Sequence, residues 1–577
     1  MRGQLEAYFD VAFTAPDGVK RLRELILSLA VQGKLTDQRD SDEPASELLR
    51  KIAVEKKKLE KEGKIKKQKP LLPVGDDEKP YTLPKGWEWV RLGNVTEYIQ
   101  RGKSPNYVDK SDYPVISQKS IQWFGFNKNV VRFVSEDSIS SYGAERFVRK
   151  GDMLWNSTGT GTIGRINIYR GELDEYKRVV CDSHVTIVRP LLISCEYAIL
   201  FLMSRYVQNF IEARASGTTN QIELNTTLVV EQILPLPPLA EQQRIVERVN
   251  SLMARCDALE AIHKEQEHKR NSARAAAMHA ITMPQGTTDL ALAFSRNWGF
   301  LARNFEQLFT TKQDIAELRK TILQLAVMGK LTDQRDSDEP ASELLKKIAV
   351  EKKTLEKVGK IKKQKPMPPV GDDEKPYTLP KGWEWVRLIG IATLIEYGTS
   401  RKTHTNSTCV PVYRMGNIFN GELFNDSLKY IDHCSPELPR LFLKKFDILF
   451  NRTNSFELVG KSAIYYGENN NATFASYLIR IRLLLEFINV EFISISMNSD
   501  YYKRTQIDKY ATQQCGQANF NGTKLGQTLL PLPPIEEQQR IVERVNSLMS
   551  LCDTLEERME ARTQAQHSLL NAVSAIV

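Results

Sequence analysis

The sequence has few cysteines, no long apolar run and no recognisable catalytic motif. Its seven cysteines are scattered and never spaced as CxxC, so neither a disulfide framework nor a zinc knuckle is predicted. No stretch approaches the ~18 consecutive apolar residues of a transmembrane helix, and the N-terminus lacks the apolar segment of a signal peptide. We therefore expect a cytoplasmic protein that does not enter a membrane.

Motifs for nucleotide or metal chemistry are also missing. The sequence contains no GxxxxGK[ST] loop, no HExxH, no DPPY or NPPY tetrapeptide and no DEAD box. The segment Gly159 to Gly164 (GTGTIG) matches GxGxxG, but another β pattern follows it instead of a helix, which favours a β-turn over a dinucleotide site. His184 lies in a strand pattern, which favours a packed or hydrogen-bonded residue over a catalyst, and His433 beside Cys434 lacks further zinc ligands. We expect no catalytic residue, no metal and no cofactor on this chain.

Size and charge set weak limits on function. The 577 residues correspond to roughly three to four domains by length. Lys and Arg number 80 against 71 Asp and Glu, a net charge of +9. This modest basic excess is compatible with nucleic-acid binding and does not establish it.

The most informative feature is a duplication. The run from Gly33 to Arg91 returns as Gly329 to Arg387 with five changes, and the run from Leu234 to Asp257 returns as Leu530 to Asp553. Both repeats have the same offset of 296 positions, so one unit was duplicated whole. The segments 93–233 and 389–529 between these runs barely match. A repeated frame around two different inserts favours two unlike recognition surfaces that meet one type of partner.

Two long helices are predicted, each starting after a repeated PLPP motif. In the first, apolar residues are spaced alternately four and three apart, as in a coiled-coil seam, and no Pro or Gly occurs between 239 and 281. The second continues in the same way to the C-terminus. Because each helix is apolar along one stripe only, we expect the two to pair as an antiparallel coiled coil, with a pseudo-two-fold internal repeat. Packing of each helix on its own domain is the alternative.

Shorter helices and linkers complete the frame. Helices are expected over 22–31 and 318–327, and again from Pro44 to Gly63 and from Pro340 to Gly359. The lysine-rich segments 64–70 and 360–366 are interpreted as linkers, although they could touch phosphates. The expected organisation is an N-terminal helical arm with the first frame (1–92), recognition domain 1 (93–233), a central coiled-coil helix (234–285), connector helices with the second frame (286–388), recognition domain 2 (389–529) and a C-terminal coiled-coil helix (530–577).

The inserts alternate short apolar runs with turn residues, which predicts strand-rich domains and an α/β (mixed) fold class. In the first insert, strands are expected within 113–121, 151–157, 164–171 and 183–190, followed by one helix over 196–212. In the second, they are expected within 410–418, 446–452, 460–467 and 475–483, followed by a helix over 490–505.

Side chains suited to base edges cluster at the predicted strand ends of both inserts. Arg and Lys pair with guanine, whereas Asn and Gln pair bidentately with adenine. An exposed Asn or Arg in a turn is more often plain surface, but the clustering at matching places favours DNA contacts. In the first insert the candidates are Arg101, Lys103, Ser104, Gln118, Lys119, Asn156, Ser157, Thr158, Thr218, Asn220 and Gln221. In the second they are Arg401, Lys402, Arg414, Asn417, Asn451, Arg452, Thr453, Asn454, Gln514, Gln517 and Asn519.

These features together resemble a known family. LPKGWEWVRL before a variable segment, LPLPPLAEQQRIVERV after it, and the repetition of both resemble the specificity subunit of a type I restriction-modification system, the HsdS family. The resemblance spans essentially the whole chain. It implies two target recognition domains, each reading one half of a split DNA sequence, and an antiparallel coiled coil that fixes the number of unread base pairs.

The resemblance also implies partners. Two modification (methyltransferase) subunits would bind S-adenosylmethionine and methylate adenine, and two restriction (motor-nuclease) subunits would bind ATP and Mg and cleave double-stranded DNA. This chain would be a non-catalytic subunit required for host defence. A coiled-coil adaptor that binds only proteins is the main alternative. A stand-alone DNA methyltransferase would need a βαβ cofactor core and an (N/D)PPY loop, which are absent.

Overall fold

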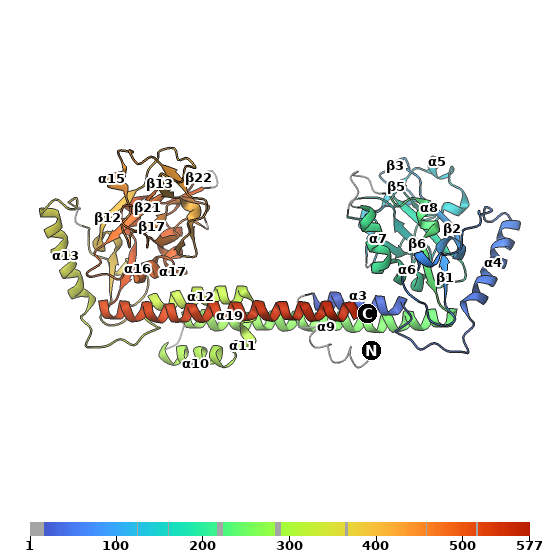
Figure 1. Ribbon diagram of the computed structural model, residues 1–577, viewed down its shortest axis with the longest axis horizontal. Helices are drawn as coiled ribbons and strands as arrows, with labels where there is room; N and C mark the ends of the chain where they lie inside the picture. Colours follow the sequence, from blue (N-terminus) through green and yellow to red (C-terminus); the bar gives the residue numbers. More distant parts are fainter. Residues whose placement is uncertain are drawn as a thin grey trace. The chain divides into compact units, whose positions relative to one another are not determined.

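The computed structural model describes residues 17–576 apart from 124, 160, 216–222, 283–289, 364–366, 457 and 515–516. The chain divides into two compact units, residues 1–266 with 563–577 and residues 267–562. Each contains one strand-rich domain and parts of the long helices, as expected for a mixed α/β protein (Figure 1). Within the described residues, no helix has the length and hydropathy needed to cross a membrane.

The first strand-rich domain is built from two small sheets. One has the strand order β2-β9-β6-β7, all antiparallel, and the other has the order β3-β5-β4-β8 with β4 and β8 parallel. Alternating apolar residues of β6 and β9 fill the space between sheet and helices, as the sequence pattern predicts. The strands are β2 (Thr96–Arg101), β3 (Tyr107–Val108), β4 (Pro114–Ile116), β5 (Arg132–Val134), β6 (Met153–Asn156), β7 (Ile166–Ile168), β8 (Val180–Cys181) and β9 (Val185–Pro190); the helices are α5 (Glu136–Ile139), α6 (Cys195–Leu202), α7 (Arg205–Ala215) and α8 (Thr226–Glu231).

The second domain repeats this topology with different residues. Its main sheet has the order β12-β21-β17-β19, and its second sheet has β16-β13-β20 with β13 and β20 parallel. The strands are β12 (Ala392–Tyr397), β13 (Val410–Tyr413), β14 (Ile418–Phe419), β15 (Glu422–Leu423), β16 (Lys429–Ile431), β17 (Ile448–Asn451), β18 (Thr453–Asn454), β19 (Ser462–Ile464), β20 (Thr473–Phe474), β21 (Leu478–Leu483), β22 (Thr512–Gln514) and β23 (Gln517–Asn519); the helices are α14 (Leu388–Ile391), α15 (Leu438–Leu441), α16 (Val490–Met497), α17 (Asp500–Tyr502) and α18 (Gly522–Gln527).

The single helix expected after the last long strand of each insert is broken in two. In the first domain α6 ends at Leu202 and α7 begins at Arg205, and Gln208 Nε2 donates to the carbonyl of Leu202 at the break. In the second domain the Ser499 hydroxyl accepts from the Tyr502 amide and starts α17. The expectation of one continuous helix is wrong because polar side chains at the break satisfy backbone groups that a continuous helix would bond internally.

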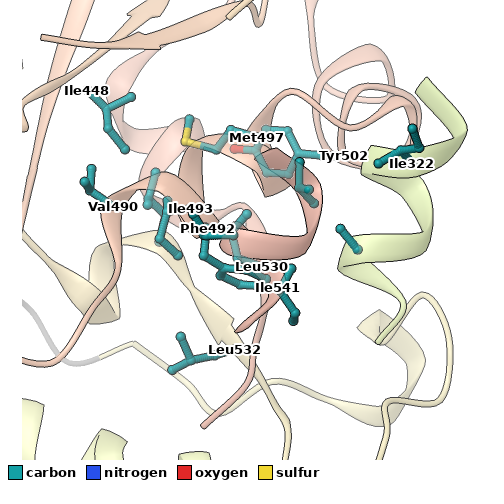
Figure 2. Packing of buried hydrophobic residues seen from close by; sticks show 14 of the residues in the cluster. Ile322, Ile448, Val490, Phe492, Ile493, Met497, Tyr502, Leu530, Leu532 and Ile541 are labelled. Atoms are coloured by element: carbon teal, nitrogen blue, oxygen red, sulfur yellow. The ribbon is translucent and has the colours of Figure 1, made fainter. Parts of the chain in front are cut away.

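Each domain is closed by strands of the repeated frame. β1 (Glu88–Arg91) pairs antiparallel with β10 (Ile233–Leu236), so the chain enters and leaves the first domain at the same place. β11 (Glu384–Arg387) and β24 (Leu529–Leu532) pair in the same register in the second. Buried residues of α16, β24 and the following helix form one cluster there, in which Phe492 lies next to Leu530 and Ile541 (Figure 2).

The frame is reproduced contact by contact, always at the offset of 296. A buried glutamate accepts from a tryptophan indole and from a glutamine amide in each copy, and an arginine of the short helix pairs with acidic residues of the long one. The matched pairs are Trp87–Glu241 and Trp383–Glu537, Gln38–Glu241 and Gln334–Glu537, Arg23–Asp257 and Arg319–Asp553, Arg244–Asp42 and Arg540–Asp338, and Arg91–Glu78 and Arg387–Glu374.

The frame helices agree with the sequence pattern within a few residues. α3 (Gly18–Val31) lies beside the first part of α9 (Leu239–Thr282), and α12 (Lys312–Val327) lies beside α19 (Ile535–Ile576) (Figure 1). α9 has 44 residues, which gives about 66 Å of helix. The remaining helices are α4 (Ala45–Lys61), α10 (Leu290–Arg303), α11 (Phe305–Leu308) and α13 (Ala341–Lys357).

The first parts of the predicted apolar seams are buried. Ile245, Val249 and Cys256 of α9 pack on α3, and Ile541, Val545 and Cys552 of α19 pack on α12. Ala277 and Ile281 at the end of α9 share the second of these clusters with α19. Pairing of α9 with α19 along their full length stays a prediction, because it would join the two units.

Candidate nucleic-acid interface

The predicted residues of the first domain gather at one edge of its main sheet. β2 and β6 both run antiparallel to β9, so they end at the same edge, with Arg101 and Asn156 as their last residues. Arg101 Nη1 forms an ion pair with Glu223, and its Nη2 donates to the carbonyl of Ser157 at 3.4 Å. The guanidinium is therefore held at this edge, where Glu223 competes with any anionic ligand.

Gln118 and Asn156 fix the glycine-rich turn between β6 and β7. Asn156 is fully buried, and its Nδ2 donates to the carbonyls of Gln118 and Thr162 at 2.9 and 3.2 Å. The Thr162 hydroxyl donates to Gln118 Oε1 at 3.0 Å. Gly159 has a φ of 101°, a conformation that favours glycine. The GTGTIG segment is thus a hairpin turn, as predicted, and the buried side chain of Asn156 positions it.

Hydroxyl groups next to this turn bond to the start of β9. The Thr158 hydroxyl lies 2.6 Å from His184 Nδ1, and the Ser104 hydroxyl lies 3.0 Å from that of Ser183. Ser157 is buried and bonds to Thr186 across the sheet. His184 itself is exposed. The sequence pattern favoured a packed or hydrogen-bonded His184, and the hydrogen bond is confirmed, whereas its place at the exposed edge was missed.

One buried carboxyl adjoins this edge. Burial raises the pKa of Asp182, and the hydrogen bond that its carboxylate accepts from the His184 amide at 2.9 Å acts in the opposite direction. The two candidate lysines differ in their surroundings. Lys103 Nζ donates to the carbonyl of Ser141 at 3.0 Å and lies 5.2 Å from the Tyr142 ring centroid, whereas Lys119 is exposed.

The second domain has the same edge with other side chains. The Arg452 guanidinium lies 4.9 Å from the centroid of the Tyr397 ring, and its Nη1 donates to the carbonyl of Ser476 at 3.3 Å. The Thr453 hydroxyl donates to Asn519 Oδ1 at 2.7 Å. Asn451 is 1% exposed and directs its Nδ2 at the carbonyl of Leu458. Asn451 thus has the same role in its loop as Asn156 has in the first domain.

Other candidates of the second domain lie in loops beyond the second sheet. Asn417 is buried and donates to the carbonyls of Phe424 and Asp426 at 3.1 and 2.8 Å, and Arg414 donates to the carbonyl of Ser427 at 2.9 Å. Arg401 and Lys402 are exposed.

For the six remaining candidates the structure gives less detail or none. The Asn454 side chain accepts from the Ser455 amide. Gln514 and Gln517 face each other in the β22–β23 ladder, where only the backbone is described. Thr218, Asn220 and Gln221 lie outside the described residues.

Strand pairing identifies equivalent positions in the two domains, and three of those at the edge carry different side chains. Arg101 and Thr186 are ladder partners in the first domain, as Tyr397 and Ile479 are in the second. The amide of Ser157 donates to the carbonyl of His184, and the amide of Arg452 donates to that of Tyr477. These positions carry arginine, a buried serine and histidine in one domain, and tyrosine, arginine and tyrosine in the other.

Below these edges each domain has an ion pair between an arginine and a buried aspartate. Arg189 donates through Nε and Nη2 to both carboxylate oxygens of Asp152 at 2.7 Å. Arg482 binds Asp447 in the same way at 2.7 and 2.6 Å. Bidentate pairs of this kind hold strands in a fixed geometry. Each domain thus combines a rigid sheet with a variable set of loop side chains, an arrangement suited to recognition.

Sequence reasoning missed several residues of these edges. Glu223, Tyr397 and Tyr477 were not candidates, because the search favoured Arg, Lys, Asn and Gln in turns. Tyr477 is 50% exposed at the position equivalent to His184. Exposed aromatic rings stack on bases, so an aromatic residue at the end of a strand, as Tyr397 is, or just before one, as Tyr477 is, was the signal that could have found the two tyrosines.

Known proteins resemble this chain over nearly its full length. Residues 84–269 and 380–563 match the family described as "Type I restriction modification DNA specificity domain". The chain is 32% identical over 578 residues to the type I restriction enzyme EcoEI specificity subunit of Escherichia coli, covering 96% of this chain and 93% of the relative. The EcoAI specificity subunit of Escherichia coli is 32% identical over 572 residues with the same coverage. The HsdS subunit of Thermoanaerobacter tengcongensis has 18% identity and a TM-score of 0.43, with 85% of this chain and 97% of that chain covered.

Proposed function

Because this chain belongs to the family of type I restriction-modification DNA specificity proteins, we propose that each of its strand-rich domains reads one half of a split DNA sequence. The observation that carries the proposal is the contrast between frame and insert. The frame contacts recur residue for residue at one offset, whereas equivalent positions on the two sheet edges carry unlike side chains. A repeated surface suits two copies of one partner, and unlike edges suit two different half-sites.

The chemistry of the edges supports contact with double-stranded DNA. Arg401, Lys402 and Lys119 are exposed and can approach phosphates, which fix position without reading sequence. Arg101 is the last residue of β2 and Arg452 directly follows β17, and at both places a guanidinium can bind guanine O6 and N7. The buried Asn156 and Asn451 would act by holding the turns that carry the reading side chains. Direct base contact by the remaining predicted residues stays a prediction.

The partners follow from the same premise. Two modification subunits would dock on the two copies of the frame and supply S-adenosylmethionine and adenine methylation, and two restriction subunits would supply ATP, Mg and DNA cleavage. Native mass spectrometry of the assembled complex tests this, with two modification subunits per chain expected and one contradicting the proposal. The DNA substrate places the complex in the cytoplasm, which cell fractionation checks.

Exchange of one recognition domain is the central experiment. Residues 93–233 would be replaced by the corresponding segment of a relative, in a host that expresses the partner subunits, and methylated adenines would be mapped genome-wide. One half of the methylated sequence should change while the other half stays the same. The matched exchange of 389–529 should change only the other half. A change in both halves after either exchange would contradict the proposal.

The adaptor alternative makes a different prediction in the same experiment. A protein that only joins other proteins would leave the methylated sequence unchanged after both exchanges, provided that the complex still assembles. Native mass spectrometry of the exchanged complexes supplies that control. The methyltransferase alternative would require the isolated chain to retain S-adenosylmethionine, which equilibrium dialysis measures.

A further inference from the structure

A histidine, a cysteine and an aspartate meet on the second sheet of the second strand-rich domain. One ligand atom from each of His404, Cys409 and Asp432 lies within 4.8 Å of the other two. His404 Nε2 is 3.4 Å from Asp432 Oδ1, and Cys409 Sγ is 3.8 Å from the same oxygen. Among the described residues this is the group of His, Cys, Asp and Glu that could hold a metal ion.

Backbone pairing builds this group. β13 and β16 are antiparallel with Val410 opposite Ile431, so Cys409 and Asp432 continue the ladder by one step and face each other. His404 pairs with Tyr430 on the other side of β16, through hydrogen bonds of 2.9 and 3.0 Å. Because side chains two residues apart share a face of a strand, His404 and Asp432 lie on the same face. Two ladders thus hold the three side chains.

The two measured separations match a tetrahedral zinc ion. Zinc binds cysteine sulfur at about 2.3 Å and histidine nitrogen or carboxylate oxygen at about 2.0 to 2.2 Å. Tetrahedral angles then place nitrogen and oxygen about 3.4 Å apart and sulfur and oxygen about 3.6 Å apart. The distances of 3.4 and 3.8 Å agree with these values, and the nitrogen of His404 and the sulfur of Cys409, which lie within 4.8 Å of each other, would come to about 3.6 Å around the ion.

We propose that His404, Cys409 and Asp432 bind one zinc ion, with a water molecule in the fourth position. A thiolate, an imidazole and a carboxylate together suit zinc better than Mg²⁺ or Ca²⁺, which prefer oxygen ligands alone. Binding releases the thiol proton of Cys409 to solvent, and the single proton of the neutral His404 imidazole moves from Nε2 to Nδ1 by exchange with solvent. The histidine then carries its proton on Nδ1 and gives up the long hydrogen bond of 3.3 Å from the Asn406 amide.

The ion would fasten a loop to the sheet. Residues 398–409 connect β12 to β13 and carry Arg401 and Lys402, and His404 lies in the middle of that segment. Because His404 would share the zinc ion with Cys409 and Asp432, the ion would tie this loop to the ends of β13 and β16. Under the proposed function, zinc would therefore order two basic residues that face DNA in the second half-site only.

The first domain supplies an internal comparison. Val115 and Val412 are equivalent, because each forms the first residue pair with the neighbouring parallel strand, β8 in the first domain and β20 in the second. By the same ladders, Val108, Asp112 and Ser135 take the places of His404, Cys409 and Asp432. Valine and serine are not zinc ligands of the usual kind. One zinc per chain, and not two, is the expected stoichiometry.

Zinc content of the full-length chain is the first test. Protein incubated with Zn²⁺ and desalted should retain one equivalent by elemental mass spectrometry, and Cys409→Ser and His404→Ala should each retain none. Cys434→Ser, which removes an exposed thiol two residues after Asp432, is the matched control and should retain the ion. Cobalt in place of zinc should give a thiolate-to-cobalt absorption band that Cys409→Ser lacks.

Alkylation of Cys409 tests the site without relying on the variants. Zn²⁺ should slow its reaction with iodoacetamide, EDTA should restore the rate, and Mg²⁺ should have no effect; peptide mass spectrometry reads each rate. The proposal would be overturned if the wild-type chain retained no more zinc than Cys409→Ser, or if the Cys434→Ser control lost its zinc. It would also be overturned if Zn²⁺ failed to protect Cys409 from alkylation. None of these measurements uses DNA, so their failure would leave the proposed function standing.

Discussion

Trp87 donates a hydrogen bond of 2.9 Å from its indole Nε1 to Oε2 of Glu241, which is 1% exposed. The other carboxylate oxygen accepts from Thr36 and Gln38. This glutamate stands in the first turn of α9, where a negative charge also favours the helix. The bond ties the first frame strand to the long helix, and Trp383 and Glu537 form the same bond at 2.8 Å in the other unit.

Trp87→Phe should destabilise the first unit. The substitution removes the indole N–H and leaves one oxygen of a buried carboxylate without this donor, which costs about 1 to 3 kcal/mol of unfolding free energy. Urea unfolding followed by hydrogen exchange would locate the loss in residues 17–266. Trp383→Phe should produce an equal loss in the other unit, and Trp298→Phe, at a 40% exposed ring, should change little. Equal stability of Trp87→Phe and the wild type would contradict the assigned bond.

Two lysines of the frame should make stability increase with pH. Burial lowers the pKa of Lys56 and of Lys352 from 10.5 to about 8. The unfolded chain therefore binds more protons than the folded chain between about pH 8 and pH 10.5, and stability rises with pH across that window. Denaturation midpoints measured from about pH 7.5 to 9.5 would detect the rise. In this range the tyrosines remain mostly protonated and do not add to it.

The double variant Lys56→Met and Lys352→Met is the comparison for this effect. Both lysines donate to backbone carbonyls at 2.7 Å, of Gly93 and Ile389 respectively. Their loss should remove the pH-dependent rise while leaving other titrations unchanged. An identical pH profile in the variant would show that these two groups are not its source.

Gly398→Ala should destabilise the second domain. A Cβ at Gly398 would lie 2.2 Å from the carbonyl oxygen of Phe474, and one at the equivalent Gly102 would lie 2.0 Å from that of Cys181. Because backbone must move to relieve either clash, we expect a loss of about 1 to 3 kcal/mol or more. Gly416→Ala has open space around its Cβ and is the matched control. Thermal unfolding compares the wild type, Gly398→Ala and Gly416→Ala. An unchanged Tm for Gly398→Ala would contradict the close approach of Gly398 to the Phe474 carbonyl.

Arg452→Ala should relax the reading of one base position. Its guanidinium stands at the sheet edge of the second domain, and loss of a bidentate contact to guanine costs about 1 to 3 kcal/mol of discrimination. Methylation mapping in the assembled complex should show a weaker preference in one half-site alone. Lys445→Ala controls for loss of charge, because Lys445 is an exposed cation just before the start of β17, the strand that Arg452 follows. Equal effects of both variants would indicate a general electrostatic contribution.

Part of the architecture could be predicted because it depends on local patterns. Alternating apolar residues predicted the long strands of both inserts, and the four-and-three spacing of Ile245, Val249 and Leu252 predicted the buried side of α9. The helix breaks at Ser204 and Ser499 were missed, because the search followed the apolar periodicity, which continues on both sides of each break. The breaks are made by local hydrogen bonds of a glutamine or serine to a backbone group three to six residues away, which apolar periodicity does not report.

The sequence by itself determined that one frame occurs twice around two unlike inserts, since identical residues at one offset must form identical local contacts. Only the tertiary structure decided which polar side chains are available for binding. Asn156 and Asn451 look like base-reading residues in the sequence, yet both are buried. His404, Cys409 and Asp432 look unrelated, yet two strand ladders bring them together. Strand register joins residues that are distant in the chain, and no local pattern specifies it.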